Sequence, residues 1–376
     1  MSRPCEVVSG VRRYALPGGT AALLHPDRQR LFLLNPTAHF LWRVLARFGG
    51  SRLPSALVSR FGIPLDQAQR DVAATLTEWQ AFGLLGNMAP AAISPPLKER
   101  RGGVPEQLLY EERVRLGTLV VNVRAAERIA HRLMPLLQHL RTDAVPSDLD
   151  CVLQTSAEGT GSLTINGVTR VDRQQDSVLI GAFYQALLEH LHPATRWSAM
   201  IHAGAVAKDD NAVIVAGPSG SGKSTLVAYL ATRGFEYLAD DLVALTPDGA
   251  VTPFPLPVGV KSGGAKALAA FYRQIDVRSP GDVQYIAQDE NFLAPPRPAK
   301  MLLFPNYVAD AATSIHALSI EDAVARLLND RIFFGYPIGE DAVSEFFHWL
   351  RDAERWALTY SRFEEAERCV AQIMHA

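Results

Sequence analysis

Residues 213–226 read VIVAGPSGSGKSTL, and this stretch decides the fold class. Its glycines and its Lys-Ser pair have the spacing G-x-x-x-x-G-K-S, which is the pattern of a P-loop. The apolar residues before the loop predict a strand, and STLVAYLATRG after it predicts a helix that stops at Gly234. In this context successive backbone N–H groups can face phosphate oxygens, and the helix N-terminus adds its dipole. The stretch therefore predicts an α/β domain that binds a nucleoside triphosphate.

The loop residues have distinct expected roles. Lys223 would reach the β- and γ-phosphates, and the hydroxyl of Ser224 would ligate Mg²⁺. We expect the nucleotide to contact the loop and the first helical turn at Gly217, Ser219, Gly220, Ser221, Gly222, Lys223, Ser224 and Thr225. The expected cofactors are therefore ATP and Mg²⁺.

Two adjacent carboxylates, Asp240 and Asp241, follow in the apolar, strand-like run GFEYLADDLVAL. They come one helix after the P-loop, where a neighbouring strand would end beside the phosphates. One carboxylate, which we assign to Asp241, would join Ser224 in holding Mg²⁺, and one would accept the proton of an attacking hydroxyl. Since successive strand residues point to opposite faces, the two acids should have different roles. The alternative is a pair of strand-end acids that pair with arginine.

His202 lies in MIHAGAV, before the strand that enters the loop. A lone histidine is more often a core residue than a catalyst. Its place beside the loop strand nevertheless suggests an acid–base role, or a role in orienting an aspartate.

Residues 201–245 resemble the catalytic domain of bacterial HPr kinase/phosphorylase, and more closely the HPr-kinase-related proteins found beside peptide-modification genes. The resemblance implies a P-loop serine kinase domain over residues 106–376, using ATP and Mg²⁺. It implies one site built from the histidine, the loop Lys-Ser and the Asp-Asp pair, with an aspartate as the base. In this chain these residues are His202, Lys223, Ser224, Asp240 and Asp241.

The chain also departs from the HPr enzyme. It lacks the Gly-rich, Arg-containing segment that accompanies phosphorolysis there, so the resemblance does not extend to the reverse reaction. The segments FPLPVGVKSG and PPRPAKMLLFP follow instead and resemble the HPr-kinase-related proteins. Their cations Lys261, Arg297 and Lys300 are candidates for stabilising phosphoryl charge. The alternative is that each is an ordinary surface cation.

The first ninety residues predict a second, smaller domain. Turn signals between apolar segments near residues 14–34 predict an antiparallel hairpin or meander. Three helical patterns follow: NPTAHFLWRVLARF with Asn35 as N-cap, RLPSALVSRFG, and PLDQAQRDVAATLTEWQAFGLLG, with Val72, Leu76, Trp79 and Phe82 on one face of the last. This arrangement is winged-helix-like α+β. We place its boundary at residues 1–90, with a Pro- and Gly-rich linker over 91–105.

About residues 10–87 resemble the PqqD-like peptide-recognition family of ribosomal peptide biosynthesis. The resemblance implies that a precursor's leader peptide adds as a strand to a sheet edge. RQRLFLLN offers that edge, with Arg28, Arg30, Leu31 and Leu33 as the expected contacts. Residues 1–100 hold twelve Lys or Arg against six Asp or Glu, which suits an acidic leader. DNA binding is the alternative, but the third helix is nearly neutral, so we expect no nucleic acid.

The amino-acid composition limits the classes of protein to which the chain can belong. Cys5, Cys151 and Cys369 are odd in number and far apart, which favours a reducing cytoplasm over a disulfide framework. No apolar run approaches the roughly 20 residues of a membrane span, so no membrane is expected. The leading hypothesis is a kinase for a hydroxyl, with serine as first choice, on a precursor peptide. The alternatives are a nucleotide-gated peptide chaperone, and an ATPase or small-molecule kinase. Other peptide-modifying enzymes as partners, and an oligomer, remain open.

Overall fold

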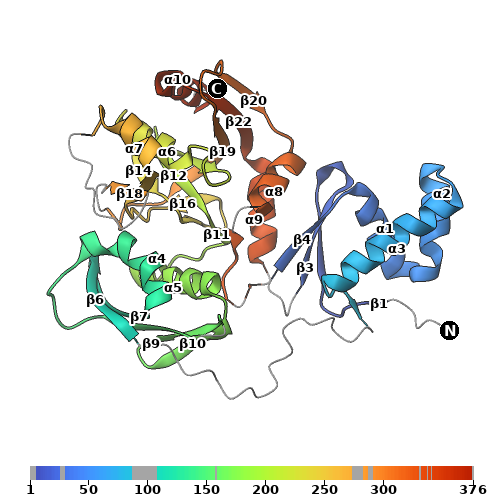
Figure 1. Ribbon diagram of the computed structural model, residues 1–376, viewed down its shortest axis with the longest axis horizontal. Helices are drawn as coiled ribbons and strands as arrows, with labels where there is room; N and C mark the ends of the chain where they lie inside the picture. Colours follow the sequence, from blue (N-terminus) through green and yellow to red (C-terminus); the bar gives the residue numbers. More distant parts are fainter. Residues whose placement is uncertain are drawn as a thin grey trace. The chain divides into compact units, whose positions relative to one another are not determined.

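The computed structural model describes residues 6–25, 30–86, 108–156, 159–272, 283–286, 291–329, 332–336, 338–339 and 341–374. The chain divides into two compact units, Met1–Arg101 and Gly102–Ala376 (Figure 1). The predicted linker at 91–105, Arg28 and the side chain of Arg30 lie outside the described residues. Within the described residues, no helix combines the length and the hydropathy that a membrane span needs.

The first unit is a small antiparallel sheet followed by helices. The sheet has the order β2-β3-β4. Its elements are β2 (Arg12–Ala15), η1 (Pro17–Gly19), β3 (Ala21–His25), β4 (Arg30–Leu34), α1 (Pro36–Phe48), η2 (Gly50–Arg52), α2 (Leu53–Phe61) and α3 (Leu65–Ala81), with β1 (Glu6–Val7) paired to β5 (Leu85–Gly86). The α+β architecture predicted for this part of the chain is confirmed.

Local signals explain where these helices begin and how they pack. The Asn35 side chain accepts a hydrogen bond from the Ala38 N–H at 2.8 Å, and the next residue, a proline, begins α1. The predicted inward face of α3 is also confirmed, because Val72 and Trp79 are buried. Trp79 meets Trp42 of α1 edge-to-face at 5.1 Å between ring centroids. Trp79 is therefore a core residue of this unit.

The second unit begins with a sheet of order β10-β9-β8-β7-β6. Its strands are β6 (Leu108–Leu116), β7 (Leu119–Ala126), β8 (Leu149–Thr155), β9 (Gly161–Ile165) and β10 (Val168–Gln174). The helices α4 (Glu127–Leu137) and α5 (Asp176–Leu191) pack on one face of it, and η3 (Gln138–Leu140) follows α4 (Figure 1). Alternate residues of β8, such as Cys151 and Leu153, are buried in that layer.

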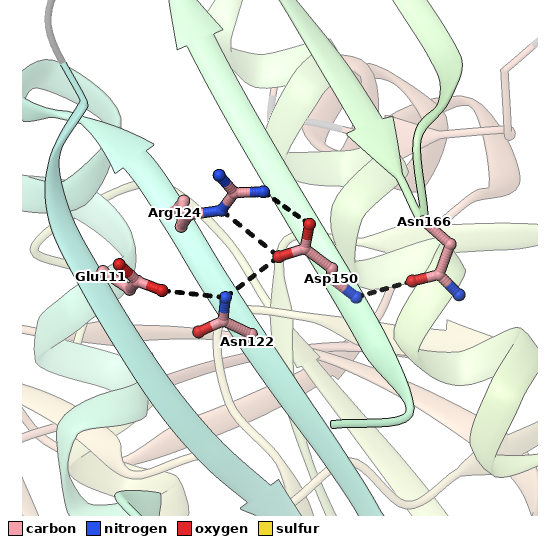
Figure 2. A network of polar contacts seen from close by, with 5 residues as sticks. All are labelled: Glu111, Asn122, Arg124, Asp150 and Asn166. Atoms are coloured by element: carbon pink, nitrogen blue, oxygen red, sulfur yellow. Dashed lines mark hydrogen bonds and ion pairs between the residues drawn. The ribbon is translucent and has the colours of Figure 1, made fainter. Parts of the chain in front are cut away.

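The other side of β7 and β8 carries a polar network (Figure 2). Arg124 forms a two-point ion pair with Asp150, at 2.6 and 3.3 Å. The Asn122 amide donates to Asp150 and to Glu111, and Asn166 accepts from the Asp150 backbone N–H at 2.7 Å. The hydrogen bond from Arg124, and with smaller effect the bond from Asn122 and the Arg124 charge, lower the pKa of Asp150, while partial burial acts in the opposite direction. The network joins neighbouring strands and shares no residue with the P-loop.

The large sheet of the second unit positions the loop. Its order is β14-β12-β13-β19-β16-β15-β11-β21, and β22 pairs with both β19 and β20. Its strands are β11 (Ala199–Ile201), β12 (Ala203–Lys208), β13 (Asn211–Ala216), β14 (Glu236–Ala239), β15 (Val243–Leu245), β16 (Ala250–Thr252), β19 (Arg297–Tyr307), β20 (Ser314–Ala317), β21 (Ile332–Phe333) and β22 (Glu354–Tyr360). The remaining elements are α6 (Lys223–Ala231), β17 (Val258–Lys261), α7 (Ser262–Leu268), β18 (Val283–Ile286), α8 (Ile320–Asn329), α9 (Ala342–Asp352) and α10 (Phe363–Met374).

Strand direction brings distant segments to one edge of this sheet. The strands β13, β19 and β22 are parallel, and β14 runs the same way because both β13 and β14 are antiparallel to β12. The carboxyl ends of these four strands, and the start of β12, therefore share one edge. The segments that follow the four strands meet there, although they are far apart in the chain.

Candidate active site

The P-loop lies between β13 and α6, in the strand–loop–helix context that the sequence predicts. Gly217, Gly220 and Gly222 have φ values of 140°, 89° and 93°, a region that disfavours residues with a side chain. The Ser221 N–H donates to the Pro218 carbonyl at 3.1 Å and closes the turn. The loop conformation therefore depends on these glycines.

Two tyrosines hold the end of the loop. A β-carbon on Gly222 would lie 2.6 Å from the Tyr360 hydroxyl oxygen and 3.2 Å from the Tyr307 β-carbon. The Tyr307 N–H donates to the Ser221 carbonyl at 3.0 Å, and the Tyr360 hydroxyl donates to the Gly222 carbonyl at 3.4 Å. The ends of β19 and β22 thus fix the loop from one side, a contact that the sequence did not predict.

Lys223 is the first residue of α6 and lies inside the loop. Its side chain is buried, and its ammonium donates to the Gly217 carbonyl. Thr225 packs against α7, where a β-carbon on Gly264 would lie 2.5 Å from the Thr225 hydroxyl oxygen. A buried ammonium held by a loop carbonyl is placed to meet phosphate oxygens.

Asp240 is a buried carboxylate, with only 2% of its surface exposed. Neither of its oxygens has a hydrogen-bond partner of good geometry among the described residues. Burial and then the charge of Asp241 raise its pKa to about 8, while the nearby Ser224 hydroxyl and the Lys223 charge act in the opposite direction. An unpartnered buried carboxylate beside a P-loop serine fits a divalent cation, which would supply the missing charge.

The described residues hold no cluster of three or more His, Cys, Asp or Glu that could bind a metal ion by itself. A cation near Asp240 and Ser224 would therefore need phosphate oxygens and water as further ligands. Mg²⁺ binds proteins in this way, because it keeps several waters and takes substrate phosphates. The residues present fit Mg²⁺ bound together with a nucleotide.

Unlike the buried carboxylate of Asp240, the Asp241 side chain is 45% exposed. Its Oδ1 lies 3.7 Å from Nδ1 of His202, and its carbonyl oxygen lies 3.2 Å from the same nitrogen. The φ of Asp241 is 63°, in the left-handed region, so the chain turns sharply between β14 and β15 at this residue. The structure thus brings His202 and Asp241 together beside the loop.

The structure corrects two expectations about where Asp240 and Asp241 lie relative to the strands of the sheet. Asp240 and Asp241 lie in a bend after β14, not inside a strand, so strand alternation does not separate them. The left-handed turn at Asp241 separates them instead. The strand before the acids, β14, does not neighbour the P-loop strand either, because β12 lies between β14 and β13. The acids still reach the loop because β14 and β13 end at the same edge.

A cavity of about 540 Å³ lies over the loop. His202, Asp241 and the loop residues line it, together with Lys261, residues of β17, β18 and α7, and the aromatic residues Tyr285, Tyr307, Tyr360 and Phe363. That these aromatic residues line the cavity was not predicted from the sequence. The available signal was weak: Tyr307 and Tyr360 each end an apolar strand, as many core tyrosines do.

The three cations proposed as phosphate ligands lie in two different places: one lies beside the loop and two lie at the opposite end of the sheet strands. Lys261 lies in the cavity and donates to the Ser219 hydroxyl at 3.2 Å. Arg297 pairs instead with Glu236 at 2.9 Å and Asp210 at 3.1 Å. Those partners lie at the start of β14 and in the turn before β13, one strand length, or about 20 Å, from the loop. Lys300 is exposed near that same end of β13, so neither Arg297 nor Lys300 reaches the loop.

In the first unit, the predicted peptide edge corresponds to β4. This strand is at an end of the described sheet β2-β3-β4. Leu33 is 37% exposed and Leu31 is half-buried, whereas Phe32 and Leu34 point into the core. The Phe82 ring stacks on Phe32 at 4.9 Å, so Phe82 packs behind β4. The described part of β4 thus offers apolar side chains on its outer face.

Comparisons with known proteins identify a domain family for part of the first unit. A solved structure, the Hpr(Ser) kinase/phosphatase from Coxiella burnetii, is 12% identical, with a match over 47% of this chain and 99% of that chain. Its TM-score is 0.23. A search of curated proteins found no match. The family model described as coenzyme PQQ synthesis protein D, PqqD, matches residues 20–85. Residues 20–85, which take in β3, β4 and α1 to α3, therefore form a PqqD domain.

Proposed function

We propose that the chain is a kinase that uses ATP and Mg²⁺ to phosphorylate a hydroxyl of a ribosomally made precursor peptide. The observation that carries the proposal is that the P-loop, Asp241 and His202 line one cavity, while the carboxylate of Asp240 is buried beside Ser224 of the loop. An ATPase more often relies on a polarised water, whereas a kinase needs a base for its acceptor hydroxyl, and Asp241 beside His202 is an exposed carboxylate in the cavity. The sequence resemblance to HPr kinase supports serine as the acceptor.

The roles follow from burial. Asp240 and Ser224 would hold Mg²⁺, which neutralises charge on the phosphates; the burial of Asp240 beside Ser224 favours it over Asp241, the carboxylate first expected there. Lys223 would bind the phosphate oxygens, and Lys261, which donates to the loop residue Ser219, would add a second positive charge in the cavity.

Phosphoryl transfer then needs one proton transfer. Asp241 accepts the proton of the acceptor hydroxyl while the hydroxyl oxygen bonds to the γ-phosphorus. The bond between that phosphorus and the β,γ-bridging oxygen breaks, and ADP leaves with the electron pair. His202 Nδ1 can donate to the Asp241 carbonyl oxygen at 3.2 Å and lies 3.7 Å from the Asp241 carboxylate, so it would position the base.

The PqqD domain supplies the acceptor. An extended leader peptide would add to the outer side of β4 and contact Leu31 and Leu33. Since the peptide is then tethered to the kinase unit, its acceptor residue is present at a high effective concentration.

The test is a reaction of the full chain with ATP, Mg²⁺ and the small peptide encoded beside its gene. The peptide should gain the mass of one phosphate group, and the Lys223→Ala variant should add none. A nucleotide-gated peptide chaperone would instead bind the peptide more or less tightly when ATP is added and leave its mass unchanged. Release of phosphate from ATP alone, unaffected by peptide, would support an ATPase and contradict the proposal.

A further inference from the structure

The P-loop strand separates two chemically different groups of residues. On one side, β12 and β14 bring His202, Asp240 and Asp241 to the loop. On the other side, β19 and β22 end in Tyr307 and Tyr360, which contact the loop at Gly222. Both groups line the same cavity, except for the buried Asp240. The cavity therefore has one end that carries the acids, with Tyr285 near them, and another end lined by Tyr307, Tyr360 and Phe363.

The positions of these two groups of residues determine the orientation that a nucleotide would have in the cavity. Under the proposed function, the terminal phosphate must lie beside Asp240 and Asp241, because transfer occurs there. The phosphate chain is held by the loop between the two groups of residues. The nucleoside, at the other end of that chain, must then extend toward β19 and β22. The only large side chains that the cavity lining offers on that side are Tyr307, Tyr360 and Phe363, among the residues that the structure describes.

Of these, Tyr307 lines the cavity and has the more exposed ring of the two tyrosines. It is 48% exposed, whereas Tyr360 is fully buried. The Tyr360 ring packs edge-to-face against the Tyr307 ring, at 5.6 Å between centroids, and so supports it from the protein core. The backbone N–H of Tyr307 is bonded to Ser221, so its Cα position follows the loop. Tyr307 is thus an exposed aromatic ring held against the phosphate loop.

The aromatic support extends further into the core. Phe363, at the start of α10, lies 6.2 Å from the Tyr360 ring and stacks on Tyr229 of α6 at 4.9 Å. These contacts join α6, β22 and α10 around the loop. A ring supported in this way loses little conformational freedom when a ligand stacks on it.

We infer that Tyr307 is the stacking platform for the nucleotide base, an assignment that rests on the proposed nucleotide site. Stacking of a base on an aromatic ring changes affinity by roughly 5- to 100-fold. Because every base has a π-face, stacking alone does not distinguish adenine from guanine. Tyr307 is therefore expected to strengthen binding of both ATP and GTP, and to contribute nothing to binding of the phosphates alone.

The experiment compares ATP with inorganic tripolyphosphate, which has the phosphate chain and no nucleoside. Binding of each, with Mg²⁺, is measured by calorimetry on the full chain. In Tyr307→Ala, affinity for ATP and GTP should fall roughly 5- to 100-fold, while affinity for tripolyphosphate should stay within twofold. Tyr307→Phe should keep native affinity because the ring remains. Val308→Ala, a change at the next exposed residue, is the matched control and should match the native chain.

Each outcome distinguishes the inference from the proposed function. Native protein that binds neither ATP nor tripolyphosphate would contradict the nucleotide site itself. Native protein that binds both, with an equal loss for both in Tyr307→Ala, would overturn the stacking role alone, since the loop would have been damaged. No loss for ATP in Tyr307→Ala would overturn it as well. A Tyr307→Trp variant adds an independent readout: its indole fluorescence should change with ATP and not with tripolyphosphate.

Discussion

Gly204 of β12 lies directly behind the buried carboxylate of Asp240. A β-carbon on Gly204 would come within 2.9 Å of Asp240 Oδ1 and within 2.6 Å of a methyl carbon of Val227 in α6. Because Gly204 has no side chain, the carboxylate and the P-loop helix can both approach the strand. The position of Asp240 therefore depends on a residue that carries no chemistry of its own.

We expect Gly204→Ala to reduce phosphoryl transfer by about 10- to 100-fold, because a shift of about 1 Å at a catalytic group has effects of that size. Peptide phosphorylation by the full chain measures it, with the Mg²⁺ dependence of the rate as a second readout. Gly339→Ala is the control, since among the described residues a β-carbon there meets only Ala342, at an ordinary 3.8 Å. Native activity and native Mg²⁺ dependence in Gly204→Ala would show that Asp240 tolerates the shift.

The raised pKa of Asp240 predicts a pH-dependent stability of the metal-free protein. Its folded-state pKa is about 8, against an ordinary 3.8, so the folded chain keeps a proton that the unfolded chain releases. Stability is therefore lost as pH rises from about 4 to about 8. Asp240→Asn stays neutral and should be more stable than the native protein, by on the order of a few kcal/mol at pH 8 and by less at pH 5.

Chemical denaturation in the presence of a chelator, at pH 5 and pH 8, measures this difference. Asp241→Asn should reproduce only a smaller part of this trend, because it removes the neighbouring charge that helps to raise the pKa of Asp240 and leaves the burial of Asp240, the larger cause, in place. Mg²⁺ and ATP should stabilise the native chain more than Asp240→Asn, since only the native carboxylate can hold the cation. A stability gap that does not change with pH would contradict the assignment.

Asp241→Asn should slow phosphoryl transfer by roughly 10²–10⁴-fold while ATP still binds, because the amide cannot accept the acceptor's proton. Steady-state kinetics and direct ATP binding separate the two effects. His202→Ala should lower the rate less, since His202 acts through the orientation of Asp241. Unchanged turnover in Asp241→Asn would remove this carboxylate from the mechanism.

Leu33→Asp should raise the KM for the peptide about tenfold and leave the KM for ATP unchanged. The reason is that a charge replaces an exposed apolar side chain on the proposed leader-binding strand, a change worth about 1.4 kcal/mol. Leu65→Asp is the matched control: Leu65 is 54% exposed in the same unit, at the start of α3, where a negative charge is tolerated. An equal effect of both substitutions, or of neither, would argue against β4 as the peptide edge.

Much of this protein could be predicted from the sequence wherever the deciding interactions are local. The P-loop is a continuous strand–loop–helix segment, so its spacing alone identifies it. Asn35 caps α1 through an amide three residues away, and the period of Val72 and Trp79 shows the inward face of α3. In each case the physical cause lies within a few residues of the signal.

The candidate site, in contrast, depends on contacts between segments distant in the chain. Adjacent residues in the sequence, Asp240 and Asp241, differ because a left-handed turn buries one carboxylate and exposes the other to His202. The motif around Arg297 and Lys300 could not reveal that both lie at the far end of β13 and β19. Only the direction of the strands, set by pairing across the sheet, determines which end of each strand meets the loop.

The sequence by itself determined the phosphate loop, the helices of the first unit and the presence of two acids near the loop, because short-range spacing and capping specify them. The tertiary structure alone decided which acid is buried, that Gly204 makes room for it, and that Tyr307 and Tyr360 border the loop. Those features arise where the ends of parallel strands meet, and residues up to about 140 positions apart in the chain become neighbours there only after the sheet has formed.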